Sequence, residues 1–376
     1  MDFDFTEKQK DIRDRVSAAF DPASKAALIE LEGGDDGLIQ SVVLRWMKVL
    51  GRTGYLALGL ESGKDSTELL AARESLAAIS PSLFLSAETS VRMFGRLIAV
   101  YGTPEQKREF LPAVQEGHLI GTVALSEGGM SIENNPLATA GRMVGGGFVV
   151  SGSKGYVVNG PIADWIAVAG MEEERLAFFL IQKGSEGLST GERLATLGYR
   201  GVATSAISLE NCPVPPHYVI GTGEGGEPLR SVRSWEDGIL TAGSLGLMQR
   251  CYEVAVPYAK SHESGGRPII HYQEVAFKLA EMLTLMQTAQ LLAYRAAWMA
   301  EVGDGEAPVL AHAAKVFCTE SAEALASSAL QVLGGQGYLR GNLAEEGYRN
   351  AKYLQIGGTS TEISRMKIGD WVLEGK

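Results

Sequence analysis

The residue types that most often carry chemistry, cysteine and histidine, are few and scattered in this chain. The cysteines are Cys212, Cys251 and Cys318, and the five histidines show no metal-ligand spacing. Zinc sites and disulfide frameworks need ligands paired at short, regular spacing. We therefore expect no metal centre and no disulfide scaffold, and the three separate cysteines indicate a reducing compartment.

Carboxylates are the remaining residue type able to do acid–base chemistry, and one of them stands near the start of the last helical region. The segment R-S-W-E-D (residues 233–237) places Glu236 directly after Trp235, where the chain returns to helical composition. Burial raises the pKa of a glutamate toward neutrality, which suits it to proton abstraction. The helix dipole also favours a glutamate in a first helical turn, and position alone favours this structural interpretation of Glu236.

Three regions of the chain must position side chains of this kind. The first runs to about Gly117 and is expected to be helical. Thr6 with Gln9, and Thr103 with Gln106, have the spacing of capping boxes and predict two helix starts. Helical composition also recurs in two further segments, residues 38–50 and 66–79.

The middle region, from about residue 119 to 220, has the texture of a sheet. Short runs rich in valine, isoleucine and threonine alternate with glycine turns, and three glycines at 145–147 predict a hairpin. Further strands are expected at residues 164–169, 176–181 and 203–209. Strands at this spacing favour a small barrel or sandwich.

The last region, from about residue 231, is expected to be helical again. Apolar residues recur at three- and four-residue steps from Val275 to Ala293, which predicts an amphipathic helix. Residues 307–333 predict another long helix that glycines at 334 and 335 end. Pro257 lies in a helical stretch and is expected to bend or end it.

Composition excludes several classes of partner. Hydrophobic residues make up 45% and charged residues 21%, as in soluble globular proteins. The net charge is -11 without a long basic run, which argues against nucleic acid. No segment is long and apolar enough to span a bilayer, and the charged N-terminus lacks a signal-peptide core. We expect a cytoplasmic protein that binds neither nucleic acid nor membranes.

Five sequence motifs occur in order along the chain. They are Y-G-T-P-E-Q-K (101–107), A-L-S-E (124–127), G-S-K-G-Y-V-V-N-G (152–160), L-G-Y-R-G with E-N-C-P-V-P (197–201, 210–215), and Q-V-L-G-G-Q-G-Y with R-N-A-K (331–338, 349–352). Together they resemble the motifs of the acyl-CoA dehydrogenase family. A helical unit, a β unit and a helical bundle in that order are not the pattern of a dinucleotide-binding fold, so such a fold is not indicated.

The resemblance implies an α+β multidomain fold with a bound FAD. An N-terminal all-α domain (1–118) would precede a central β-barrel-like domain (119–222) and a C-terminal four-helix bundle (223–376). FAD would lie between the β domain and the bundle and reach a neighbouring subunit, which implies a homodimer or homotetramer.

The activity that the resemblance implies is oxidation of the Cα–Cβ bond of an acyl thioester. A carboxylate removes the α-proton, and the β-hydrogen passes as hydride to flavin N5. The acyl group would be carried by CoA or by a carrier protein. Electrons would pass on to an acceptor such as an electron-transfer flavoprotein or oxygen.

The catalytic base departs from the majority pattern of the family. The usual glutamate lies in a C-terminal Y-E-G-T motif, where this chain has Gly358 within Q-I-G-G-T-S-T-E-I. A minority branch, which includes the isovaleryl and long-chain enzymes, carries the base on the first helix after the β domain, and Glu236 matches that position. Gly358 could still offer its backbone N–H to the thioester carbonyl, although it also suits a simple turn.

Residues of the β domain and of the C-terminal loop are expected to contact the flavin, because the resemblance carries over position by position. Tyr156 and Val157 would pack on the ring system, although ordinary strand packing explains both equally well. Val158 stands where a threonine hydroxyl normally approaches N5, so that hydrogen bond is lost. The remaining contacts would come from Ser126, Ser131 and Ser360.

The FAD contacts from the partner subunit match the family only in part. A glycine turn, Gly334 and Gly335, matches together with Gln331, although it also suits a helix stop. His262 replaces the arginine that usually binds the pyrophosphate. Arg267 could supply that charge, and an exposed arginine without a ligand is an equal alternative.

Two alternatives to a dehydrogenase stay open on the sequence. The valine at position 158 and the glycine at 358 suit a flavin oxidase or monooxygenase on the same fold. The mismatches at His262, Gly265 and Gly358 suit a degenerate subunit that binds partners without catalysis.

Overall fold

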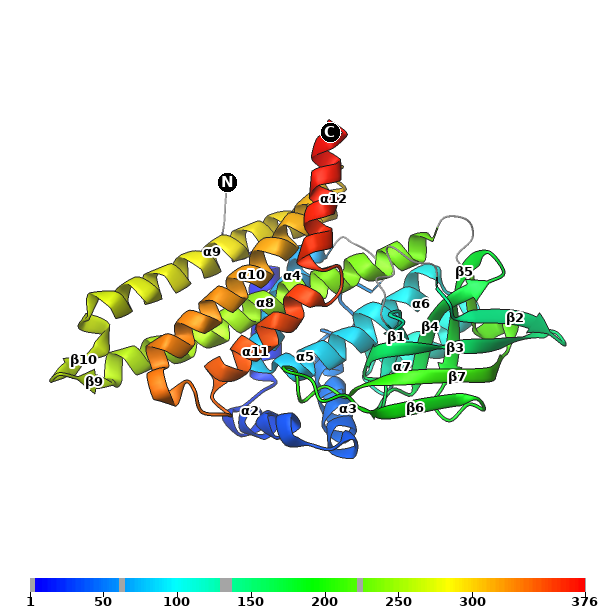
Figure 1. Ribbon diagram of the computed structural model, residues 1–376, viewed down its shortest axis with the longest axis horizontal. Helices are drawn as coiled ribbons and strands as arrows, with labels where there is room; N and C mark the ends of the chain where they lie inside the picture. Colours follow the sequence, from blue (N-terminus) through cyan, green and yellow to red (C-terminus); the bar gives the residue numbers. More distant parts are fainter. Residues whose placement is uncertain (1–3, 61–64, 129–136, 222–225, 376) are drawn as a thin grey trace.

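A computed structural model describes residues 4–60, 65–128, 137–221 and 226–375. It shows helices, then a sheet, then helices, with the sheet at one end of an elongated body (Figure 1). Helix α8 (Glu227–Ser261) runs from the sheet to the far end of the helical bundle. Within these ranges no helix is long and apolar enough to cross a membrane, and no three histidine, cysteine or acidic side chains are grouped so that they could hold a metal ion.

The N-terminal region is helical, as expected. Its elements are α1 (Glu7–Ala18), α2 (Pro22–Leu28), η1 (Ile29–Gly33), α3 (Asp36–Arg52), α4 (Ser66–Ile79), α5 (Pro81–Glu88), η2 (Thr89–Gly95), α6 (Arg96–Tyr101) and α7 (Pro104–Gln115). Both capping boxes are confirmed, because Thr6 and Thr103 each exchange hydrogen bonds with the glutamine three residues on. These bonds satisfy amide groups that a helix N-terminus leaves unpaired.

A π-helical segment joins α5 to α6 without a break. In η2 the turn widens over Thr89–Gly95, and all of its residues are buried. Strand β1 (Gly121–Ala124) packs directly on it, and a side chain at Gly121 would overlap the Phe94 ring. Such π-helical turns are often found at functional sites, and this one faces the cavity described below.

The β region forms one open, mixed sheet and not a closed barrel. Its strands are β1, β2 (Ala140–Val144), β3 (Gly147–Val158), β4 (Trp165–Glu172), β5 (Arg175–Gln182), β6 (Leu188–Arg193), β7 (Thr204–Val214) and β8 (Val219–Gly221), with η3 (Pro216–Tyr218) before β8. The order is β6-β7-β3-β2-β4-β5-β8, with β1 added in parallel beside β4. Because β6 and β8 are not paired with each other, the barrel-like expectation is corrected to an open sheet.

The C-terminal region is a helical bundle. Beyond α8 it contains β9 (Glu263–Ser264), β10 (Arg267–Pro268), η4 (Ile269–His271), α9 (Gln273–Val302), α10 (Ala307–Leu333), η5 (Gly334–Gln336), α11 (Leu343–Ile356) and α12 (Thr361–Leu373). The helix predicted at 307–333 is confirmed, and Gly334 ends it with a φ of 57°. Pro257 does not end α8, which continues one turn to Ser261. Pro257 is exposed, so water can reach the carbonyl that its missing N–H leaves unpaired.

Helix α8 owes its central place to small residues on the face toward α4. A side chain at Gly246 would lie 2.5 Å from the Ala77 Cβ atom, so only glycine allows the two backbones this close. The residues from Leu69 to Ala77 of α4 are buried. This packing fixes α8, and with it Glu236, between the N-terminal helices and the rest of the bundle.

A buried ion pair in the β region gives a stability prediction. The Glu127 carboxylate accepts hydrogen bonds from Lys154 (2.8 Å), the Thr139 hydroxyl (2.6 Å) and two backbone amides. These bonds outweigh burial and lower the pKa of Glu127 from 4.5 to about 2. A group with a lowered folded pKa stabilises the fold above its unfolded pKa, and this contribution is lost as pH falls from about 4.5 toward 2.

We therefore expect Glu127→Gln to lower the free energy of unfolding at pH 7 by about 3 kcal/mol, since one pKa unit corresponds to about 1.4 kcal/mol. The variant should also lose part of the acid sensitivity of the wild type. Urea unfolding at pH 7 and pH 4 measures both effects. Glu105→Gln, which breaks an exposed pair with Arg108, is the control and should change stability by less than about 1 kcal/mol. Equal effects of the two changes would contradict the assignment.

Candidate functional site

A cavity of about 390 Å³ lies where the sheet, the helix α5–η2 and the bundle meet. This volume is within the range of small-molecule sites. The cavity is lined from the helices by Leu85, Thr89, Met93, Arg233, Glu236, Ile239, Leu240, Arg349, Lys352, Tyr353 and Ile356, from the loop after α11 by Gly357 and Gly358, and from the β region by Val123, Leu125, Ser126, Tyr156, Val158, Thr196, Leu197 and Gly198. Apolar side chains dominate, and a few polar groups converge among them.

Among the described residues that line this cavity, Glu236 is the acidic side chain. It lies on α8 about two turns after the helix begins at Glu227, and 18% of its side chain is exposed. Burial is the largest influence on its carboxylate and raises its pKa, and the neighbouring Asp237 raises it further. A carboxylate of this kind is suited to accept a proton near neutral pH.

Arg233 holds the carboxylate in place from one turn earlier on α8. Its Nη1 atom lies 3.2 Å from Glu236 Oε2, and its Nη2 atom donates to the Gly358 carbonyl oxygen at 2.5 Å. Arg233 therefore ties the base to the loop between α11 and α12. Its charge lowers the pKa of Glu236 and opposes the larger effect of burial.

Gly358 directs its backbone N–H toward the same carboxylate and has no room for a side chain. Its φ is 61°, and an added Cβ atom would lie 2.5 Å from Asp237 Oδ1 and 3.2 Å from a Leu240 methyl group. Asp237 Oδ1 in turn accepts the Thr359 N–H at 2.7 Å. The space in which a residue-358 side chain would begin is thus occupied by Asp237.

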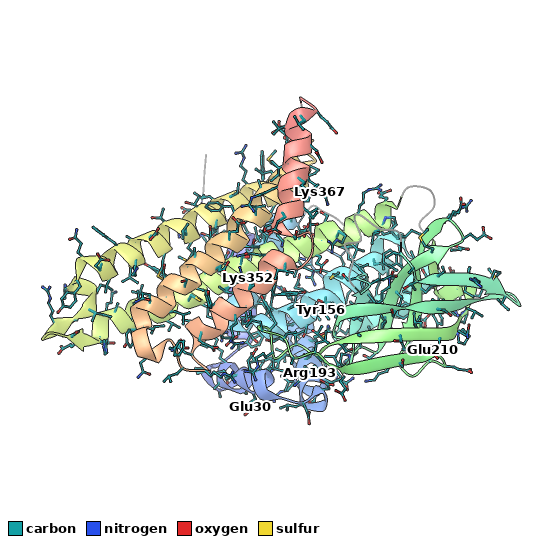
Figure 2. All side chains as sticks on the ribbon, viewed as in Figure 1. Glu30, Tyr156, Arg193, Glu210, Lys352 and Lys367 are labelled. Carbon is teal, nitrogen blue, oxygen red and sulfur yellow. The ribbon has the colours of Figure 1, made fainter. Side chains whose placement is uncertain are left out.

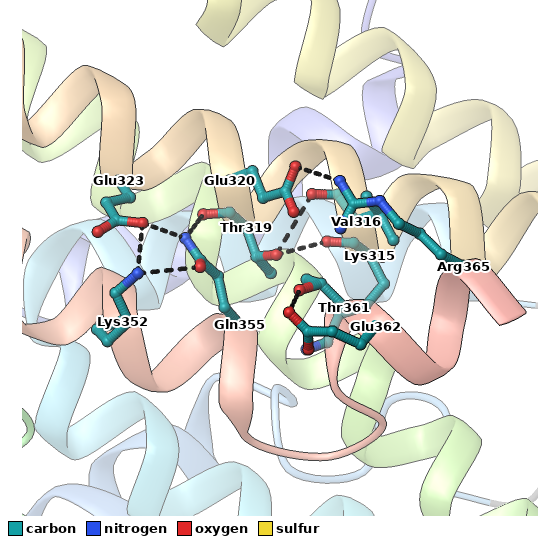
Figure 3. Close-up of polar contacts among 10 residues, drawn as sticks. All are labelled: Lys315, Val316, Thr319, Glu320, Glu323, Lys352, Gln355, Thr361, Glu362 and Arg365. Atoms are coloured by element: carbon teal, nitrogen blue, oxygen red, sulfur yellow. Dashed lines mark hydrogen bonds and ion pairs between the residues drawn. The ribbon is translucent and has the colours of Figure 1, made fainter.

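Buried and polar contacts fix the loop that carries Gly358. Lys315 on α10 is fully buried and donates to the carbonyl oxygens of Leu354 at 2.5 Å and Gly357 at 3.1 Å. Burial lowers its pKa to about 8. Nearby, Glu323 on α10 accepts from Lys352 at 2.7 Å and Gln355 at 2.6 Å, as Figure 3 shows.

The opposite wall of the cavity comes from the sheet. Tyr156 lies at the sheet end that faces the bundle (Figure 2) and stacks on Tyr353, with ring centroids 6.0 Å apart. Burial raises the pKa of Tyr156 to about 12. Ser126 and Val158 also line this wall, whereas the side chain of Val157 is fully buried and turned away from it. Alternation along β3 explains the difference, since neighbouring strand residues face opposite ways.

The other expected flavin contacts that the structure describes do not line this cavity. His262 is 26 residues beyond Glu236 along α8 and its C-cap, which corresponds to about 39 Å. Gln331, Gly334 and Gly335 lie at the C-terminal end of α10 and in η5. Arg267 packs over the Tyr272 ring at 4.3 Å, and Ser360 caps α12 through the Ile363 amide. Ser131 lies outside the described residues.

Two contributors to the site were not predicted from the sequence. Arg233 was part of the motif around Glu236 but had no role assigned, although a spacing of three residues places both side chains on one helix face. Lys315 gave a weaker signal, a single lysine within the apolar helix stretch A-H-A-A-K-V-F-C. Its function as a clamp depends on α11, about forty residues later.

The cavity fits a planar aromatic cofactor with an acyl chain beside it. Tyr156 and Tyr353 offer aromatic surface, Ser126 a hydroxyl group, and Leu85 and Met93 apolar walls. Glu236 and the Gly358 N–H converge on one point of the wall, which suits a ligand carbonyl with an acidic hydrogen beside it. The site can therefore combine proton abstraction with stabilisation of the resulting negative charge.

Comparisons with known proteins agree with this arrangement. Family models match residues 6–118 (acyl-CoA dehydrogenase, N-terminal domain), 122–212 (middle domain) and 234–373 (C-terminal domain). The mitochondrial isovaleryl-CoA dehydrogenase of Oryza sativa subsp. japonica is 34% identical over 304 residues, covering 79% of this chain and 74% of that protein. The benzylmalonyl-CoA dehydrogenase of Aromatoleum aromaticum is 29% identical, covering 98% of each chain. The solved structure of butyryl-CoA dehydrogenase from Megasphaera elsdenii matches in fold, with a TM-score of 0.89, 24% identity, and coverage of 99% of this chain and 100% of that one.

Proposed function

The chain belongs to the acyl-CoA dehydrogenase family, and we propose that it oxidises the Cα–Cβ bond of an acyl thioester with FAD, using Glu236 as the base. The observation that carries this proposal is that the Glu236 carboxylate and the Gly358 N–H lie next to each other in the wall of one cavity. The usual position of the base holds a glycine that has no room for a side chain, and a buried glutamate on α8 faces the same point.

Proton abstraction is assigned to Glu236. An α-hydrogen of a thioester is far less acidic than a carboxylic acid, so the base needs a raised pKa and the enolate needs stabilisation. Burial raises the pKa of Glu236. The Gly358 N–H, held by the Thr359–Asp237 hydrogen bond and by Arg233, is the donor for the thioester oxygen.

FAD is held in this proposal by two walls of the cavity. Tyr156 and Tyr353, whose rings stack in the cavity wall, would contact its ring system, and Ser126 would offer a hydrogen bond, while Val158 would offer none. The resemblance implied that Val157 packs on the flavin ring system. Because its side chain is buried in the sheet, only its backbone would be left for such a contact. Bound FAD would supply the acceptor for the β-hydrogen.

A second copy of the chain completes the cofactor site in this proposal. His262, Arg267, Gln331, Gly334 and Gly335 lie at the end of the bundle remote from Glu236, where they could serve the FAD of a neighbouring subunit. Helix α9 exposes large apolar side chains that suit such an interface, namely Phe277, Leu291 and Trp298. We propose domain limits of 1–118, 119–222 and 223–376.

The test of the proposed function is a panel of thioesters incubated with FAD-loaded enzyme and an artificial electron acceptor. Straight, branched and aminoacyl groups should each be offered on CoA and on a carrier protein. We expect mass spectrometry to show loss of two hydrogens from at least one member, with reduction of the artificial electron acceptor. A panel without any such loss would overturn the proposal.

The Val158 side chain favours one second candidate, a flavin oxidase that passes electrons directly to oxygen. Val158 lines the cavity where the resemblance places a hydroxyl group near N5. Stopped-flow reoxidation distinguishes the two functions. Reoxidation by air within the turnover time would support the oxidase, and slow reoxidation by air with rapid transfer to an electron-transfer flavoprotein would support the dehydrogenase.

Arg233 gives a prediction on pH dependence. Its positive charge lowers the pKa of Glu236, so Arg233→Gln should raise that pKa further. Because the base must be ionised, the acidic limb of the kcat/KM profile should move to higher pH. Arg233→Lys, which keeps the charge, should restore much of the original profile. A limb that stays in place or moves to lower pH in Arg233→Gln would contradict the role given to Arg233.

A further inference from the structure

A second and larger cavity, of about 770 Å³, lies on the other side of Arg233. Arg233 lines both cavities, and Asp237 and Thr359 line the second one next to Glu236 and Gly358 of the first. Its walls come from α4, α6, α8, α9, α10 and α12, the helix that projects from the body in Figure 1. A ligand with its thioester at Glu236 would therefore have one of its ends beside or within this second cavity.

The inner wall of the second cavity rests on a buried cluster of three arginines and one glutamate. Glu88 is fully buried and accepts from Arg73 Nε at 2.5 Å and from the Tyr55 hydroxyl at 2.7 Å. Arg92 lies 3.8 Å from the same carboxylate and donates to the Tyr55 and Leu56 carbonyl oxygens. One carboxylate therefore faces two buried guanidinium groups, which leaves an excess of positive charge.

Arg73 and Arg96 bring this positive charge to the cavity wall. Arg73 is 7% exposed, and its Nη2 atom is buried without a hydrogen-bond partner among the described residues. The Arg96 guanidinium lies 4.7 Å from the centre of the Trp235 ring, and its Nε atom also has no partner within the described ranges. Burial and the nearby Arg73 and Arg92 lower the pKa of Arg96 to about 10, which still leaves it charged at neutral pH.

A buried guanidinium with an unused donor is costly unless an anion completes it. Guanidinium groups bind carboxylate and phosphate oxygens in preference to neutral groups, because charge and donor geometry both match. We propose that Arg73 and Arg96 form an anion subsite in the second cavity, which binds a carboxylate or phosphate group of the ligand whose thioester lies at Glu236. The proposal rests on the proposed function for the placement of the thioester, but the subsite itself does not depend on turnover.

The anion has two possible sources in a thioester substrate. It could be a carboxylate at the far end of the acyl group, or a phosphate of the arm that carries the acyl group. Two arms of one experiment separate them. The first compares glutaryl-CoA with butyryl-CoA, and the second compares butyryl-CoA with butyryl-pantetheine, which has no phosphate.

Dissociation constants should be measured for FAD-loaded enzyme in which Glu236→Gln prevents turnover, by the change in flavin absorbance. In one of the two arms, we expect at least tenfold tighter binding of the ligand that carries the additional anionic group, equivalent to about 1.4 kcal/mol. In that arm, Arg96→Met should remove at least tenfold of the binding of this ligand and leave the binding of its comparison ligand unchanged. Arg96 is the better site for this test, because Arg73→Met would remove the shorter of the two ion pairs of the buried Glu88 and impair folding.

A probe without any thioester separates this proposal from the proposed function. Calorimetric titration with inorganic diphosphate and with glutarate should show binding to the FAD-loaded wild type that Arg96→Met weakens at least tenfold. Arg108→Met, which removes an exposed arginine on α7, is the matched control and should leave binding unchanged. A preference below threefold in both arms, or equal loss in Arg96→Met and Arg108→Met, would overturn the subsite even if the enzyme oxidises thioesters.

Discussion

In a Glu236→Gln variant, thioester oxidation should fall by about 10³-fold, the scale of a lost general base. Glutamine keeps the size and the hydrogen-bonding shape of the side chain but cannot accept the α-proton. Because the side chain contributes one wall of the cavity among many, FAD and substrate should still bind. The measurements are single-turnover reduction of the flavin by substrate, together with the FAD content of the purified variant.

The matched control for this prediction is Glu362→Gln. Glu362 lies in the first turn of α12, four residues after Gly358, and is exposed. Its substitution removes the same charge from an exposed position and should leave the rate of flavin reduction within about threefold of the wild type, since surface substitutions have small effects. A Glu236→Gln variant that reduces flavin within tenfold of the wild-type rate would exclude Glu236 as the base.

Substitution of Gly358 should have the second-largest effect. In Gly358→Ala the new Cβ atom would meet Asp237 Oδ1 at 2.5 Å, and a φ of 61° is strained for a residue other than glycine. To avoid this contact, the loop between α11 and α12 must move, and the N–H of residue 358 must move with it. Loss of a donor of this kind typically costs about 10²-fold in rate. We expect that loss in kcat, with stability reduced by about 1 kcal/mol or more.

A double variant, Glu236→Gln with Gly358→Glu, asks whether the majority position can take over the base. The same contact with Asp237 predicts that it cannot, and activity should stay at the Glu236→Gln level. Gly369→Ala on α12, where an added Cβ meets no atom within 4 Å, is the control and should keep full activity. Recovery of the double variant to within tenfold of the wild type would show that Asp237 does not block the position.

Local sequence signals predicted the helices well. The helix at 307–333 and the two capping boxes depend on residues within one or two turns of each other, so a short window contains all of the information. The strands were also recognisable, but their arrangement was not. Whether a sheet closes depends on which edges pair, and the parallel pairing of β1 and β2 with β4 joins residues about thirty or more positions apart.

The candidate site was only partly predictable for a related reason. Glu236 and Gly358 were identified by their place in motifs, and the structure brings both to one cavity. The effect of Asp237 on residue 358 could not be read from the sequence, because it depends on the packing of α8 against a loop 120 residues later. The cluster of Arg73, Glu88 and Arg92 likewise consists of residues whose pairing needs the packed helices.

The central claim, that Glu236 removes the α-proton, is tested most directly by hydrogen exchange into a thioester that cannot be oxidised. An acetyl thioester has α-hydrogens but no β-carbon, so exchange with deuterated water reports proton abstraction alone. FAD-loaded wild type and Glu362→Gln should exchange these hydrogens at comparable rates, and Glu236→Gln should be slower by about 10³-fold. Exchange by Glu236→Gln at the wild-type rate would show that another group is the base.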